Sequence, residues 1–132
     1  MSYREVSLLR DRSLRMLRSA KRCLLDGDYD IAAFMADQAV QLYLKSVIFE
    51  LTGEVPRVHA VRRLMRVLRE LLGKPSLIDD FVRKNRSMLI RLEEACVGSR
   101  YMPREYEREE AEELVEFAEE AIGFVESVKG EG

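Results

Sequence analysis

The chain has 132 residues, of which 35% are charged and 47% are hydrophobic, and its formal net charge at pH 7 is -2. This length fits a single domain, residues 1–132, that can bury enough apolar surface to fold without a metal ion or disulfide bonds. No run of eighteen uncharged apolar residues occurs, so we expect no membrane-spanning helix and a cytoplasmic protein.

Charge is distributed unevenly along the chain. The formal charge is +5 for residues 1–22, -5 for 23–56, +7 for 57–91 and -9 for 92–132. Basic and acidic helices that lie side by side can pair on the surface, whereas a basic helix that stands apart can meet phosphate. The chain has seventeen arginines and five lysines, and this preference for arginine resembles the surface composition of thermophile proteins. Cys23 and Cys96 are expected to be free thiols in a reducing compartment.

The first two predicted helices differ in how much of their surface is apolar. Residues 3–25 form an amphipathic helix with a basic outer face. Residues 28–53 are apolar around most of the helix, with Asp28 suited to an N-cap and Gly53 to a left-handed stop. Because only a surrounded helix needs this pattern, we predict that residues 28–53 form the central helix.

One narrow stripe of the central helix is polar. Its side chains must face water, a cleft, a partner or each other, because burying unsatisfied polar groups is unfavourable. A ribbon of solvated side chains and a functional site both agree with this pattern. The stripe contains Asp30, Phe34, Asp37, Gln38, Gln41 and Lys45.

The third predicted helix begins near Ala60 and ends at Gly73. Its outer face consists of Arg62, Arg63, Arg66 and Arg69. His59, the single histidine, lies where this helix begins. Without a second histidine, that position favours a hydrogen-bonding residue at the helix N-terminus over a catalytic or metal-binding residue.

Ser76 can cap a fourth predicted helix, residues 77–97, with Asn85 in the middle of its core side. A core-facing Asn either bonds a neighbouring group or lines a functional cleft. Gly98 and Ser99 are expected to end this helix. Residues 100–106 then lead to a last helix with an acidic exterior.

No segment shows the alternation of a strand, so the sequence predicts an all-α fold. The most economical arrangement is an up-and-down four-helix bundle with one additional short helix. Neither a Gly-rich phosphate loop nor the spacing of zinc ligands occurs, so we expect no metal and no cofactor.

Two stretches carry a resemblance to a known family: FMADQAVQLYLKSVIFELTGEVPRVHAV and LEEACVGSRYMPREYEREEAEELVEFAEEAI. Their amide-rich helix, Gly-x-x-Pro-x-x-His turn and Gly-Ser-Arg-Tyr-x-Pro junction are similar to those of the HEPN domain, named for a higher eukaryotes and prokaryotes nucleotide-binding domain. The likeness extends over about residues 28–128. It implies a small helical bundle, usually a homodimer, that many prokaryotes encode beside a minimal nucleotidyltransferase as a toxin and antitoxin pair.

The same resemblance implies a site. Active HEPN members are metal-independent ribonucleases in which an Arg, four to six intervening residues and then a His are arranged across a dimer cleft. Arg100 stands at the position of that Arg, but the positions of the His hold Glu105, Tyr106 and Glu107. Cleavage of RNA by its own 2′-hydroxyl needs a proton acceptor and donor near neutral pH, whereas Arg only stabilises phosphate charge.

The leading hypothesis is therefore a HEPN-like protein that binds RNA or a nucleotide around Arg100, with little or no cleavage. The expected binding residues are Arg100, Tyr101, Arg104, Tyr106, Asp37 and Asn85. One alternative is a ribonuclease that uses Arg100 with a relocated base, His59 or Glu105. The other is a structural dimer whose polar stripe is only an interface.

Overall fold

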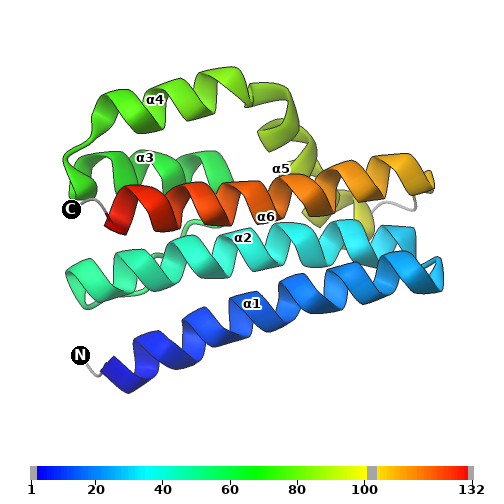
Figure 1. Ribbon diagram of the computed structural model, residues 1–132, viewed down its shortest axis with the longest axis horizontal. Coiled ribbons are helices and arrows are strands. Elements are labelled where there is room, and N and C mark those ends of the chain that lie inside the picture. Colours follow the sequence, from blue (N-terminus) through cyan, green and yellow to red (C-terminus); the bar gives the residue numbers. More distant parts are fainter. Residues whose placement is uncertain (1–2, 101–103, 131–132) are drawn as a thin grey trace.

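The computed structural model describes the backbone of residues 3–100 and 104–130, and the side chains of these residues except 97–100. The described residues form six helices and no strand (Figure 1). The all-α prediction is confirmed. The helices are α1 (Tyr3–Asp26), α2 (Tyr29–Thr52), α3 (Val61–Leu72), α4 (Pro75–Lys84), α5 (Arg86–Arg100) and α6 (Arg108–Gly130).

Helix α2 is the centre of the fold. It packs against α1, α3, α5 and α6, whereas α4 packs against α3 and α5 at the outside of the molecule (Figure 1). Fully buried side chains lie on most of its length, including Ala36, Val40, Leu44 and Val47. The apolar circumference of this segment is therefore explained by neighbouring helices, as the sequence predicted.

A glycine ends the central helix. Gly53 adopts the left-handed conformation with φ 83°, and its backbone N–H donates to the carbonyl oxygen of Phe49 at 2.8 Å. Residues with a Cβ are strained at such angles, so a glycine is the expected stop. Asp28 occupies the N-cap position of α2, but its side chain makes no capping hydrogen bond.

The predicted fourth helix is wrong in its boundaries. The structure divides it into α4 and α5 at Asn85, where both the backbone N–H and side-chain Nδ2 donate to the carbonyl oxygen of Phe81, at 3.0 and 2.9 Å. A short amide side chain that competes for a backbone carbonyl favours the end of a helix. Pro75, rather than a residue after Ser76, begins α4, and α5 continues past Gly98 and Ser99 to Arg100.

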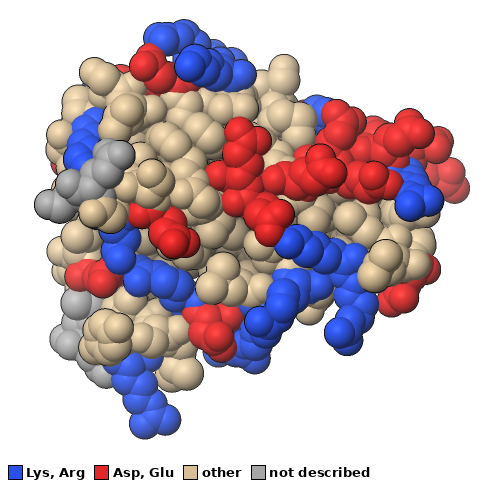
Figure 2. Space-filling model, viewed as in Figure 1, with Lys and Arg blue, Asp and Glu red and all other residues tan. Residues whose placement is uncertain are grey.

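Oppositely charged helices meet on the surface. Figure 2 shows acidic side chains gathered over α6 and basic side chains over the neighbouring α1. Lys21 of α1 and Glu119 of α6 pair at 2.5 Å, and Glu50 of α2 pairs with both Arg10 and Lys129. Exposed pairs such as Lys21–Glu119 contribute little to stability, about 0–1 kcal/mol each. They nevertheless show that the acidic face of α6 lies beside the basic face of α1.

Within the described part of the chain, none of the helices combines the length and the apolar composition that crossing a lipid bilayer requires.

Candidate functional site

The polar stripe predicted on the central helix is mostly buried. Asp37, Gln41 and Lys45 follow one another at intervals of four residues and are 0%, 5% and 9% exposed. We call these three residues the polar row. Asp30, by contrast, is exposed near the start of α2 and accepts a hydrogen bond from the backbone N–H of Ile31. The polar row is buried within one chain, so its burial does not require a second copy.

Asp37 is the most unusual member of the polar row. Its Oδ2 accepts a hydrogen bond from Gln41 Nε2 at 2.5 Å and a long contact from Gln38 Nε2 at 3.5 Å. Its Oδ1 is buried and has no hydrogen-bond partner among the described residues. A buried carboxylate oxygen without a partner is unfavourable, so packing alone does not explain this residue.

Burial raises the pKa of Asp37 from 3.8 to about 7, because the charged carboxylate loses its hydration. Hydrogen bonds from Gln41 and Cys96 oppose this effect, and the nearby negative charge of Glu93 adds to it. A carboxyl group with a raised pKa can change its protonation state closer to neutral pH than an exposed aspartate can. It can accept or donate a hydrogen bond, and it can exchange a proton.

The other end of the polar row reaches His59. Lys45 Nζ lies 2.8 Å from His59 Nδ1. An ammonium group can only donate, so Nδ1 accepts and the proton of the neutral ring lies on Nε2. Burial lowers the pKa of Lys45, while the negative charge of Asp37 opposes that shift. His59 is thus an exposed ring held by a lysine from α2.

Helix α5 forms the wall beside Asp37. Gln38 Nε2 donates to Cys96 Sγ at 3.6 Å, and Glu93 pairs with Arg62 at 2.7 Å. Arg100 is four residues after Cys96 and therefore stands one turn further along the same face of α5. Its side chain lies outside the described residues, as does Tyr101. Cys23 and Cys96 are both free thiols.

Arg104 and Tyr106 form a contact of their own before α6. The Arg104 guanidinium lies 3.9 Å from the centre of the Tyr106 ring, and its Nη2 pairs with Glu110 at 2.7 Å. Tyr106 is 8% exposed and belongs to the hydrophobic core. Its ring therefore has a packing role, with one face covered by Arg104. Glu105 is exposed between them.

Asn85 is not part of the group around Asp37. It ends α4, whereas Cys96 lies ten residues after the first residue of α5, or about 15 Å along the helix. The structure thus brings Asp37 beside the α5 face that carries Arg100, and it separates both from Asn85. The contact of Lys45 with His59 was not predicted from the sequence, although Lys45 lies on the predicted stripe.

In a comparison with protein-family models, the chain matches the HEPN domain over residues 6–128. The chain belongs to the HEPN domain family. The suspected resemblance is therefore confirmed over almost the whole sequence. Comparisons with curated proteins and with solved structures gave no match. A HEPN domain indicates a function related to nucleotides or RNA, often ribonuclease activity.

The chemistry available near Asp37 follows from the side chains placed there. Among the described side chains, no three His, Cys, Asp or Glu residues are placed to hold a metal ion. Asp37 can transfer a proton near neutral pH, and the guanidinium of Arg100 can stabilise phosphate charge. The α2–α5 site, defined as the polar row, His59 and the end of α5 at Arg100, is the candidate functional site.

Proposed function

We propose that this HEPN chain binds RNA or a nucleotide at the α2–α5 site. The observation that carries the proposal is Asp37, a fully buried carboxyl group with one oxygen unpartnered among the described residues, placed beside the α5 face that leads to Arg100. Arg100 supplies charge for a phosphate. Asp37 supplies an acceptor for the amino groups of a base, which requires α2 and α5 to separate enough to expose its buried carboxyl group.

The proposal extends to assembly. The HEPN chain forms a homodimer through the Arg100 junction and pairs with a minimal nucleotidyltransferase in a toxin–antitoxin module. Light scattering is expected to show a species of twice the 15.3 kDa chain mass. Monomer alone across a wide range of concentrations would contradict the dimer.

Replacing Arg100 tests the binding site. We expect Arg100→Ala to weaken binding of single-stranded RNA. The slope of log K against log salt concentration should decrease by the amount that corresponds to about one phosphate contact. Arg91→Ala is the matched control, since Arg91 is on the same helix and makes a long ion pair with Glu113, at 3.6 Å, and a weak hydrogen bond to Met88 Sδ, at 3.3 Å. If fluorescence anisotropy gives the same RNA affinity for both variants and the wild type, Arg100 is not part of the binding site.

One observation favours a second function. A carboxyl group whose pKa is about 7 can perform part of the proton transfer that the missing histidine performs in active HEPN members. The second candidate is therefore a metal-independent ribonuclease that uses Arg100 with a relocated base: Asp37, His59 or Glu105. It requires that RNA reach Asp37, which is buried in the described conformation.

A further inference from the structure

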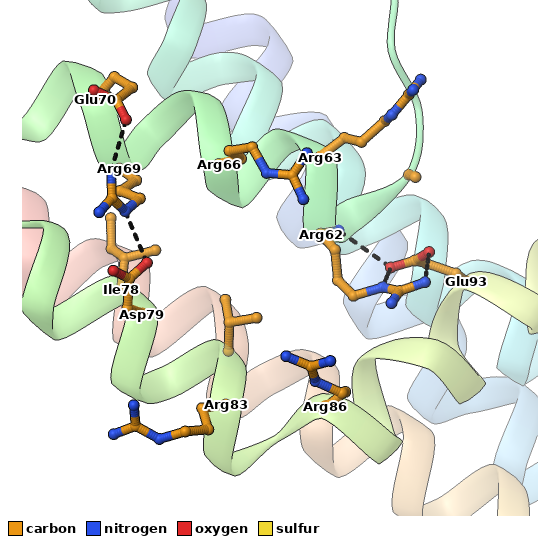
Figure 3. A pocket seen from close by; sticks show the side chains of 12 residues that line it. Arg62, Arg63, Arg66, Arg69, Glu70, Ile78, Asp79, Arg83, Arg86 and Glu93 are labelled. Carbon is orange, nitrogen blue, oxygen red and sulfur yellow. Dashed lines mark hydrogen bonds and ion pairs between the residues drawn. The ribbon is translucent and has the colours of Figure 1, made fainter.

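A second feature of the molecule is a groove between α3 and α4, of about 810 Å³ (Figure 3). Six arginines line it, against three carboxylates: Glu70, Asp79 and Glu93. We call it the arginine groove. Its arginines are Arg62, Arg63, Arg66 and Arg69 from α3, Arg83 from α4 and Arg86 from the start of α5.

Ion pairs fix the two ends of the α3 wall. Arg62 is held by both oxygens of Glu93, at 2.7 and 3.1 Å, and Arg69 is held by Asp79 at 2.8 Å and Glu70 at 2.7 Å. The Arg69–Asp79 pair also joins α3 to α4 across the groove (Figure 3). These contacts fix the side chains of Arg62 and Arg69 and leave the arginines between them without a carboxylate partner among the described residues.

The remaining positive charge is uncompensated. Arg63, Arg66 and Arg86 have no carboxylate partner in the described part of the chain, whereas Arg83 pairs with its neighbour Asp80. In Figure 3, Arg66 of α3 and Arg86 below it extend into the space between the helices from opposite sides, and Arg63 extends outward at the rim. Like charges gathered in this way destabilise a folded chain, so a binding role explains them better than packing.

Apolar side chains also line the arginine groove. Ile78 is almost completely buried, and Val82 is half-buried beside it. A ligand that combines negative charges with flat or apolar groups matches this lining, because guanidinium planes pair with phosphates and also stack on bases.

We propose that the arginine groove binds the phosphate backbone of single-stranded RNA, with Arg63, Arg66 and Arg86 as the phosphate-contacting residues. This inference rests on the proposed function and adds a second contact surface to it. A protein partner fits less well, since protein interfaces have an apolar core, whereas this surface is concave and charged.

Helix α5 connects the two surfaces. Arg86 begins α5 and Arg100 ends it, about 21 Å apart along the helix axis, which corresponds to about six stacked nucleotides. Glu93, between them, pairs with Arg62 in the arginine groove and also acts electrostatically on Asp37. A strand that follows α5 therefore reaches both the arginine groove and the α2–α5 site.

The test compares two triple variants with equal changes in charge. Arg63→Gln, Arg66→Gln and Arg86→Gln remove the unpaired arginines and leave the Arg62–Glu93 and Arg69–Asp79 ion pairs of the groove intact. Arg12→Gln, Arg18→Gln and Arg22→Gln on α1 are the control, because these arginines are exposed and α1 packs on α2 and α6, away from α3 and α4. The probe is a fluorescently labelled 12-nucleotide oligouridine, titrated at several salt concentrations.

We expect the groove variant to bind the oligouridine about 100-fold more weakly than the wild type at 0.1 M salt. Each lost phosphate contact accounts for about 0.7 in the slope of log K against log salt, so the slope falls by about 2. The α1 control is expected to remain within about threefold of the wild type. A third variant with Arg63→Lys, Arg66→Lys and Arg86→Lys keeps the slope near the wild-type value but binds less tightly, because it loses bidentate contacts.

The outcomes separate this inference from the proposed function. If the wild type binds and Arg100→Ala weakens binding, but the groove variant binds normally, the inference fails alone. If the wild type binds no RNA, the proposed function fails and the inference fails with it. If uridine triphosphate displaces the labelled probe as effectively as unlabelled oligouridine does, the ligand is a nucleotide and not an RNA strand. Tighter binding of an acidic peptide than of RNA would overturn nucleic acid as the ligand.

Discussion

Asp37→Asn is expected to make the protein more stable than the wild type at pH 8. The pKa of Asp37 is raised from 3.8 in the unfolded chain to about 7 in the folded chain. Each pKa unit corresponds to about 1.4 kcal/mol, so ionised Asp37 lowers the free energy of unfolding by up to about 4 kcal/mol. An Asn side chain has no charge to bury, and its oxygen can still accept the hydrogen bond from Gln41.

The sign of the pH dependence follows from the raised pKa. Below about pH 4 the carboxyl group is protonated in both the folded and the unfolded chain, so it makes no pH-dependent contribution. Between about pH 4 and pH 7 only the unfolded chain loses the proton, and stability falls as pH rises. Above pH 7 both forms are ionised and the loss is complete. The advantage of Asp37→Asn should therefore be small at pH 4 and largest at pH 8.

Urea denaturation at pH 4, 5, 6, 7 and 8 measures this difference. Asp26→Asn is the control, because Asp26 is exposed at the end of α1 and should change stability by less than about 0.5 kcal/mol at any pH. A pH-independent difference between Asp37→Asn and the wild type would contradict the raised pKa. A loss of RNA binding together with a gain in stability would show that Asp37 is kept for function.

The central helix could be predicted in detail because its signals are local. Gly53 ends it for a conformational reason, and apolar residues around most of its circumference require neighbouring helices. The same pattern isolated Asp37, Gln41 and Lys45 as polar residues on a buried helix. Sequence could not decide between water and a site, because that choice depends on how closely α3 and α5 approach.

The sequence-based predictions were wrong where segments that are distant in the chain meet in the fold. Asn85 matched the apolar spacing of one long helix, but its side chain bonds the carbonyl oxygen of Phe81 and ends α4. Once α4 and α5 are separate, α4 can lie opposite α3, and this placement creates the arginine groove. The sequence showed the basic face of α3, yet Arg83 and Arg86 become part of the same surface only through tertiary structure.

The second large effect concerns catalysis. We expect the purified protein to leave RNA intact between pH 6 and pH 8 in the presence of a chelator. A positioned acid or base contributes about 10²–10⁴-fold to such a reaction, and the family histidine is missing after Arg100. Asp37 can titrate in this range, but its carboxyl group is fully buried in the described conformation. It therefore cannot reach the 2′-hydroxyl of an RNA bound at the surface of this conformation.

The structure also selects where a histidine could be restored. Tyr106 belongs to the core and lies under Arg104, so Tyr106→His would disturb packing. Glu105 is exposed, and Glu105→His restores the family spacing from Arg100 without a core change. We expect this variant to gain slow, metal-independent cleavage while keeping the affinity of the wild type for RNA.

Binding and cleavage of one labelled single-stranded RNA, measured in the same chelator-containing sample between pH 6 and pH 8, test the central claim most directly. The account predicts that the wild type binds the RNA, that binding weakens as salt rises, and that the RNA stays intact. Rapid cleavage by the wild type that disappears in Arg100→Ala would contradict it. Asp37→Asn, His59→Ala and Glu105→Gln in that assay would then identify the group that transfers the proton.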